Sequence, residues 1–511
     1  MPKGKKQKVR LINLNSLKSL TKKISKAGVF KVVFSALAAT LFVIVMSFST
    51  SPLYKENYGG DSAQFQTIGK IWANGGVPYR DAFDHKGPVI FFVNSIGYRL
   101  TGDKTGIVII QIVCLFVTIL LLFKICELAS DKLYYGVIGV ILSLIFLSIF
   151  YVEGNMTEEY CLPFITWSIY GLAKFFTSLK KSEKTEHSPK WAVIYGICFG
   201  VCLMTRVTNA IPVAIGVLTI AILLVVKKKW ANLLKNAGYC FVGIMTVVAP
   251  FVIYFALQGA LGDLYYCTIG FNLEYASRVR SWLEGATRDV FAHMSITLFP
   301  SYTLLLAAFL ARERGKNTYS IFLALCGALE MIWFCSESFF PQYEMITVPQ
   351  VALLLNELIL QKNSSEARLL QSLVIALIVI LCYGQVQAVS KKVTDNYHTF
   401  SQPTTEQQDV EYLISTIPET EKNSFVAFGG NELKDVYLRN NLFPHYKYFA
   451  IQGWHSLFSE NIKNNVHDTF AHGDAKWILA DEDKVKIEDI LDSRYNIVNE
   501  RGRYTLYRIS E

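Results

Sequence analysis

The chain has 511 residues, of which 52% are apolar and only 18% are charged; its net charge is +9 and its mean hydropathy is +0.31. Soluble domains carry about 25% charged residues, whereas the apolar residues here form blocks of about 20, long enough to cross a bilayer. These values exclude a soluble multidomain protein, a disordered chain and a disulfide scaffold, and they predict a polytopic membrane protein.

The positive charge is concentrated at the N-terminus. Residues 1–31 contain ten Lys and Arg and no acid, whereas residues 390–511 contain fourteen Lys and Arg against nineteen acids. Basic residues beside an apolar run are typical of the cytoplasmic side, so residues 1–26 are predicted to be a basic cytoplasmic tail. No basic domain with interleaved aromatic residues follows, and no nucleic-acid partner is therefore expected.

Eleven apolar runs predict about eleven spans within a transmembrane domain at residues 27–389. They cover residues 27–50, 105–128, 134–152, 161–179, 190–207, 209–226, 237–258, 291–311, 318–336, 339–360 and 367–389. The shorter stretch 88–102 decides the topology. If it does not cross, the basic loops at 180–190, 227–235 and 312–316 all become cytoplasmic, in agreement with the positive-inside bias. We therefore expect an interfacial or re-entrant helix there, within a first external loop at residues 51–104.

Residues 390–511 follow the last apolar run and differ in pattern. Strand-like segments at 425–428, 477–480 and 504–508 alternate with helix-like segments at 432–439 and 487–491. This alternation predicts a small α/β domain, which the topology places outside the cell membrane.

Unusual polar residues gather in the external loops. The first loop carries Asp61 after two glycines, and then the string PYRDAFDHKGP at residues 78–88. The second loop reads EGNMTEEY at residues 153–160. The same outer side offers Arg206, Arg278, Arg280 and Tyr343. Carboxylates and cations together at a membrane face suit a substrate that bears a phosphate.

Each of these residues also has a purely structural interpretation, and these alternatives stay open. Asp61 with Gln64 has the spacing of a capping box, and Glu158 and Glu159 could be first-turn acids of a helix. Lys86 and the arginines could reach lipid headgroups, and Tyr343 could belong to the interfacial aromatic belt. His85 could be a packed loop histidine.

The loop string and the order of segments resemble the GT-C glycosyltransferases of the protein-mannosyltransferase and aminoarabinose-transferase type. The resemblance implies an enzyme that transfers a sugar from a polyprenyl-phosphate carrier to an acceptor at the outer face. It implies a catalytic role for Asp61 and for Glu158 or Glu159, without deciding between the two. The residues that it implies for donor-phosphate binding are Lys86, Arg206, Arg278 and Tyr343, and those for loop support are Tyr79, Arg80, Asp84 and His85. This chain has Lys-Gly-Pro where the mannosyltransferases have Lys-Pro-Pro, which favours a cell-envelope glycan or lipid acceptor over a protein.

The expected reaction is a single inverting displacement. Asp61 removes the acceptor proton, Lys86 holds the departing phosphate, and the second acid positions the acceptor or assists the base. No cofactor is indicated, although a divalent cation bridging Asp61 and Glu158 or Glu159 stays open. The alternatives are a transporter or flippase of lipid-linked sugars, which should carry more ionisable residues deep in its spans, and an envelope scaffold acting through residues 390–511.

Overall fold

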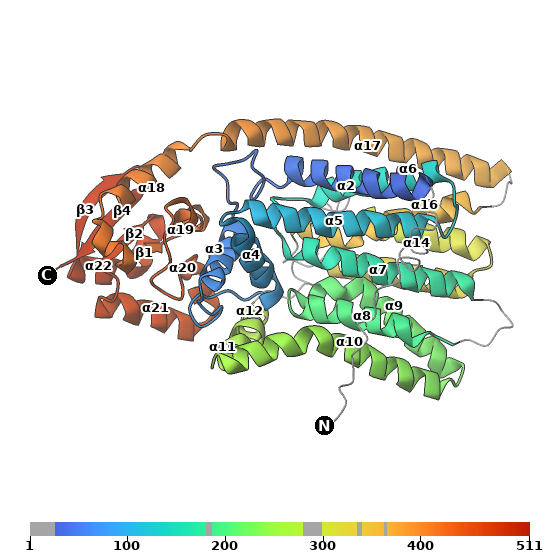
Figure 1. The fold of residues 1–511 in the computed structure, drawn as a ribbon, viewed down its shortest axis with the longest axis horizontal. Coiled ribbons are helices and arrows are strands. Elements are labelled where there is room, and N and C mark those ends of the chain that lie inside the picture. The colour runs from blue at the N-terminus through green and yellow to red at the C-terminus, as the bar shows by residue number, and fades with distance from the viewer. Residues whose placement is uncertain (1–25, 180–185, 279–298, 335–339, 362–364, 511) are drawn as a thin grey trace, which may run out of the picture.

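The computed structural model describes residues 26–179, 186–278, 299–334, 340–361 and 365–510 (Figure 1). A bundle of helices occupies one side of the molecule, and a smaller α/β domain occupies the other. Two helices, α3 (Asp61–Ala73) and α4 (Pro88–Thr101), lie between them. These two helices come from the predicted first external loop.

Each predicted span overlaps a helix of the bundle, although residues 291–298 of one span lie outside the described residues. The helices are α2 (Lys26–Met46), α5 (Thr105–Cys126), α6 (Leu133–Phe150), α7 (Thr157–Ser178), α8 (Pro189–Leu203), α9 (Ile211–Val226), α10 (Trp230–Leu257), α14 (Phe299–Glu313), α15 (Asn317–Phe334), α16 (Val348–Ile359) and α17 (Ser365–Phe400). Within the described ranges, seven helical segments are long and apolar enough to cross a membrane, which is fewer than the eleven expected. The four helices outside that set are α7, which carries polar residues, and the shorter α8, α14 and α16.

Successive helices run between two ends of the bundle. At one end, the backbone N–H of Ser49, after α2, donates to Glu153, after α6, and Lys392 of α17 donates to the carbonyl of Tyr151. At the other end, Lys31 of α2 pairs with Glu127, after α5. The α/β domain lies at the first of these ends, which we call the site end (Figure 1).

Helix α4 does not have the length of a span. Its 14 residues extend about 21 Å, compared with a hydrocarbon layer of about 30 Å. Pro88 occupies its first turn, and Gly102 ends it in the left-handed conformation with φ of 80°. Helix α3 packs closely against α4, because a side chain at Gly69 would meet Cβ of Asn94 at 2.4 Å.

The α/β domain contains a four-stranded sheet. The strands are β1 (Phe425–Phe428), β2 (Trp477–Ala480), β3 (Tyr495–Arg501) and β4 (Tyr504–Ile509), in the spatial order β1-β2-β4-β3. Strands β1 and β2 are parallel, and the other two pairings are antiparallel. The helices around it are α18 (Thr405–Ser415), α19 (Val436–Arg439), α20 (Gln452–Phe458), α21 (Glu460–His472) and α22 (Glu488–Arg494), with the short 3-10 turn η5 (Asn431–Leu433) after β1. The predicted strands 425–428, 477–480 and 504–508 match β1, β2 and β4, and β3 is additional.

The α/β domain and the external loops share one apolar core. The ring of Phe83 in the first loop lies 5.0 Å from Tyr448 and 4.9 Å from His455, measured between centroids. Short helices after α10, namely α11 (Leu261–Tyr265) and α12 (Phe271–Arg278), contribute Leu264 and Phe271 to the same core. Burial of this apolar surface fixes the domain on the bundle.

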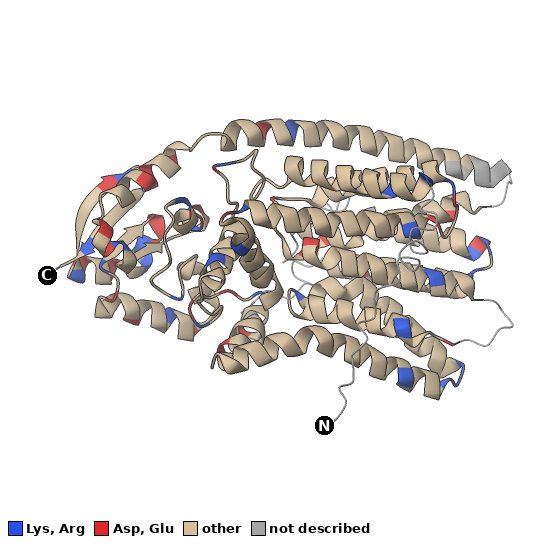
Figure 2. Ribbon diagram, viewed as in Figure 1, with Lys and Arg blue, Asp and Glu red and all other residues tan. Residues whose placement is uncertain are grey.

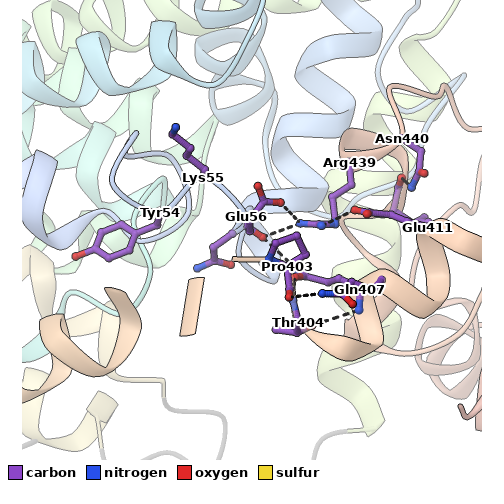
Figure 3. A network of polar contacts seen from close by, with 12 residues as sticks. Tyr54, Lys55, Glu56, Pro403, Thr404, Gln407, Glu411, Arg439 and Asn440 are labelled. Atoms are coloured by element: carbon purple, nitrogen blue, oxygen red, sulfur yellow. Dashed lines mark hydrogen bonds and ion pairs between the residues drawn. The ribbon is translucent and has the colours of Figure 1, made fainter. Parts of the chain in front are cut away.

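A polar network adds to this attachment (Figure 3). The buried guanidinium of Arg439 in α19 pairs with Glu411 of α18 and with Glu56 of the first loop, at 2.5 and 3.1 Å. Gln407 also donates to the backbone carbonyl of Glu56, at 3.1 Å. The chain before Asp61 is therefore held by residues that lie more than 340 positions further along.

Candidate active site

Asp61 is the first residue of α3, and an acid from another loop holds this helix start. The carboxylate of Glu153 accepts hydrogen bonds from the backbone N–H groups of Gly60 (2.8 Å) and Ser62 (3.1 Å). The loop must have glycine at position 59, since φ is 74° and a side chain there would meet Glu153 at 2.7 Å. The predicted capping box of Asp61 and Gln64 does not form, because Gly60 is the cap residue and Glu153 supplies the acceptor.

The carboxylate of Asp61 is paired with a lysine from the α/β domain. Oδ1 lies 3.0 Å from Nζ of Lys434, whose side chain is only 4% exposed, whereas that of Asp61 is 47% exposed. Burial would raise the pKa of Asp61, but the charges of Lys434 and Lys86 outweigh it and hold the pKa below its usual value. Asp61 is therefore an ionised carboxylate within electrostatic reach of two lysines.

The Lys-Gly-Pro string is anchored to the turn after α8. The backbone N–H of Gly87 donates to the carbonyl of Thr205 (2.8 Å), and a Cβ at this position would meet the backbone of Met204 at 2.3 Å. Proline at position 87 would lack the N–H that makes this hydrogen bond, and its ring would collide with the backbone of Met204. This contact explains why the chain has glycine between Lys86 and Pro88.

Lys86 is held in an enclosed setting by its neighbours. Its Nζ lies 2.7 Å from Nε2 of His85, its backbone N–H donates to Asp84 (2.8 Å), and its carbonyl accepts from the hydroxyl of Tyr79 (2.8 Å). Burial lowers the pKa of Lys86, although Asp84, Asp61 and Glu158 partly oppose this. Burial also raises the pKa of Asp84 and holds that of His85 well below its usual value.

The predicted loop-support residues differ in position. Tyr79, Asp84 and His85 surround Lys86 as described. Arg80 instead has its side chain 46% exposed, pairs with Asp81 and donates to the carbonyl of Gln258. Arg80 thus fastens the loop to the end of α10 and does not reach Lys86.

Arg206 lies between Glu158 and Tyr343. Its Nη1 donates to Oε1 of Glu158 at 3.3 Å, and its guanidinium carbon lies 3.1 Å from the ring centroid of Tyr343. These residues come from the start of α7, from the turn before η1 (Val207–Ala210) and from η3 (Pro341–Thr347). Arg206 and Glu158 both act electrostatically on Lys86, so they belong to the same site.

Glu159 has a different environment from Glu158. Its carboxylate accepts from the backbone N–H of Met156 (2.8 Å), from Gln111 (2.8 Å) and from the hydroxyl of Tyr151 (2.5 Å). It therefore closes the first turn of α7 and ties this turn to α5 and to the end of α6. The structural interpretation as a first-turn acid applies to Glu159, whereas Glu158 faces Arg206.

The side chains of two arginines from the sequence analysis, Arg278 and Arg280, lie outside the described structure. Arg278 is the last residue of α12, and the backbone of Arg280 lies outside the described structure as well. Nothing in the sequence indicated a role for Lys434 or His455. His455 belongs to α20, and neither of its ring nitrogens has a hydrogen-bond partner among the described residues. Glu153 was noted only as the first letter of the second loop; its position after an apolar run was the available signal.

The candidate site offers no set of ligands for a divalent cation among the described residues. The described residues contain no group of three or more His, Cys, Asp or Glu side chains that could hold a metal ion. Asp61 and Glu158 are each paired with a cationic side chain, and the oxygens of Glu159 accept three hydrogen bonds. A bridging ion does not fit this arrangement, and no step is assigned to one.

Residues 18–374 match the family model described as "Putative competence-induced protein Ccs4 N-terminal domain". The chain belongs to this family. No curated protein matches the sequence.

Solved structures of other proteins share the fold of this competence-family chain. ArnT from Cupriavidus metallidurans bound to undecaprenyl phosphate superposes with a TM-score of 0.57 at 13% identity, covering 93% of this chain and 97% of ArnT. The Archaeoglobus fulgidus oligosaccharyltransferase complexed with Zn and sulfate gives a TM-score of 0.52 at 12% identity, covering 94% of this chain and 73% of that one. Both neighbours are GT-C proteins, so the chain is a membrane protein with a GT-C fold. The finer mannosyltransferase or aminoarabinose-transferase type has no such support.

Proposed function

We propose that the chain is a membrane glycosyltransferase that moves a sugar from a polyprenyl-phosphate carrier to a cell-envelope glycan or lipid at the outer face of the membrane. The observation that carries this proposal is the convergence of Asp61, Lys86, Glu158 and Arg206 from separate segments at one end of the bundle. Structural neighbours with this fold bind undecaprenyl phosphate or dolichol phosphate, which supports a lipid-phosphate donor.

The cations provide for the leaving group. The anomeric C–O bond to the phosphate breaks, and its electron pair stays on the polyprenyl phosphate, whose negative charge Lys86 and Arg206 would hold. Preorganised charges of this kind stabilise the transition state without reorganisation. The ring of Tyr343 against Arg206 keeps the guanidinium in place.

Asp61 provides for the acceptor. The hydroxyl oxygen of the acceptor forms the new bond to the anomeric carbon, and its proton passes to Asp61. Of the two carboxylate oxygens of Asp61, Oδ1 accepts a hydrogen bond from Lys434, and Oδ2 has no partner among the described residues. Oδ2 is therefore available for a hydroxyl. Attack on the face opposite the phosphate inverts the anomeric carbon in one step. Glu158 would position the acceptor and Arg206.

We further propose the domain division of residues 1–26, 27–389 and 390–511, with the N-terminus in the cytoplasm and the α/β domain outside. The Lys and Arg residues, coloured blue, at the bundle end away from this domain support this orientation (Figure 2).

The test compares envelope polysaccharide from cells that contain the chain, cells that lack it, and cells that carry Asp61→Asn. We expect one sugar substituent to disappear in both the deletion and the Asp61→Asn cells. Unchanged composition in the deletion cells would reject the proposal. Purified chain in nanodiscs should also form the glycosidic bond from an undecaprenyl-phosphate-linked sugar, which a transporter of lipid-linked sugars would not do.

A further inference from the structure

A cavity of about 380 Å³ lies beside the catalytic candidates, where the first two external loops, the end of α17 and the α/β domain meet. Its size falls within the range of about 300–1,000 Å³ that is usual for small-molecule sites. Gly60 lines it one residue before Asp61, and Glu432 lines it two residues before Lys434. Asp61 and Lys434 do not themselves line the cavity, but each follows a lining residue by one or two positions.

The lining combines aromatic rings with amides. Phe400 supplies an apolar ring, Phe48 is only 2% exposed, and Asn57, Asn396 and Asn431 supply side-chain amides. Asn57 uses its Oδ1 for the backbone N–H of Gly59, and Asn396 uses its Nδ2 for the carbonyl of Lys392. Asn431 makes no side-chain hydrogen bond to any described residue. Donors and acceptors thus remain for a ligand rich in hydroxyl groups.

The charges of the lining are already compensated. The carboxylate of Glu153 is bonded to two backbone N–H groups, and Glu432 lies 3.8 Å from Nη2 of Arg503. None of the described lining residues is Lys or Arg. Of the lysines near by, Lys434 is paired with Asp61, and Lys392, whose Nζ lies 5.2 Å from the ring centroid of Phe48, donates to the carbonyl of Tyr151. These features fit an uncharged polar ligand.

We propose that this cavity binds a neutral sugar unit of the acceptor. The sugar would lie with its ring against Phe400, and one hydroxyl would be directed toward Asp61. The role of this sugar as the acceptor rests on the proposed glycosyl transfer. Binding of a neutral sugar in the cavity does not depend on that proposal and is tested separately.

The experiment uses the full chain in nanodiscs and measures binding of two neutral disaccharides, cellobiose and chitobiose, together with glucose 6-phosphate and glucosamine. Asn431→Trp fills the cavity from an exposed position, and Asn431→Ala removes the amide without adding bulk. Asn464→Trp, on an exposed position of α21 outside the cavity, is the matched control. Binding of undecaprenyl phosphate and the melting temperature serve as measures of an intact fold.

We expect at least one neutral disaccharide to bind the unchanged chain and Asn464→Trp alike, and to bind Asn431→Trp at least tenfold more weakly, with undecaprenyl phosphate binding unchanged. Asn431→Ala should also weaken binding of the neutral disaccharide, and it serves as the test if Asn431→Trp does not fold. Equal binding by the Asn431 variants, preference for either charged sugar, or no binding of the neutral disaccharides by the unchanged chain would overturn the proposal. Disaccharide binding by a chain that transfers no sugar would leave the cavity assignment standing and reject the proposed function.

Discussion

Both ends of the helical bundle carry charged residues (Figure 2), and the two ends differ in the partners of their Lys and Arg side chains. At the end away from the α/β domain, Lys227 and Lys228 are exposed, Lys124 is exposed and pairs with Glu127, and Arg314 pairs with the buried Glu357. At the site end, Lys86 and Arg206 are enclosed and paired or hydrogen-bonded. Exposed lysines at a membrane border gain from lipid headgroups and water, whereas enclosed cations require partners. What distinguishes the candidate site is that its enclosed cations lie near the carboxylates Asp61 and Glu158.

The largest expected effect concerns which end faces the cytoplasm. Cysteine placed at Glu186, in the loop between α7 and α8, should resist a membrane-impermeant thiol reagent in whole cells, whereas cysteine at Glu482 in the α/β domain should react. Both residues are exposed, and residues 390–511 contain no native cysteine. The unchanged chain measures background labelling, and reaction at position 186 before permeabilisation would reverse the topology.

Asp61→Asn should remove nearly all transfer, because general-base assistance is worth about 10²–10⁴-fold in rate. Transfer is measured with an undecaprenyl-phosphate-linked sugar in membranes that contain equal amounts of each variant. Asp131→Asn, an exposed acid at the opposite end of the bundle, is the control and should retain full activity. If Asp61→Asn kept more than a tenth of the activity, Asp61 would not be the base.

Lys86→Ala should weaken use of the donor more than use of the acceptor, because Lys86 is proposed to hold the phosphate. We expect KM for the donor to rise about tenfold or more, which corresponds to about 1.4 kcal/mol. Lys124→Ala removes an exposed lysine at the other end and should change neither KM. Equal effects of Lys86→Ala on both substrates would indicate general damage to the loop.

Lys434→Met should move the acid limb of the pH profile of kcat/KM to higher pH. Lys434 is the largest charge that lowers the pKa of Asp61, with Lys86 the next, so its loss lets that pKa rise. A lowered carboxyl pKa stabilises the folded chain above the usual value of 3.8, and this contribution is lost as the pH falls through the lowered pKa. Lys434→Arg keeps the charge and should keep the profile; an unchanged profile in Lys434→Met would show that the pair does not control Asp61.

The smallest effect on transfer is expected for Glu159→Ala, which should act mainly on stability. Each of its three hydrogen-bond donors would lose its acceptor, at about 1–3 kcal/mol for a buried group. The melting temperature in detergent should fall further in Glu159→Ala than in Glu158→Ala, and transfer per folded molecule should fall further in Glu158→Ala. The reverse pattern would exchange the roles of the two acids.

Sequence reasoning located the bundle helices because a span needs about 20 apolar residues, a signal that is local in the chain. It also located β1 and β2, which are buried along their whole length. Strand β3 was missed because it is an edge strand whose sequence, YNIVNER, is largely polar and exposed.

The candidate site was predictable only where its residues lie close together in sequence. The string around Lys86 marked one part of it. The choice between Glu158 and Glu159 depends on helix rotation, since neighbouring residues point about 100° apart around the axis. Lys434 could not have been identified, because it lies 373 positions from Asp61 and only the packing of the α/β domain brings the two together.

The order of strands has a consequence for biosynthesis. Strand β4 lies inside the sheet between β2 and β3, so the α/β domain cannot complete its sheet until residues 504–509 have been synthesised. Lys434 reaches Asp61 only from this domain. A nascent chain, or one that a nonsense mutation ends before β4, would therefore contain every bundle helix and still lack the completed domain that brings Lys434 to Asp61.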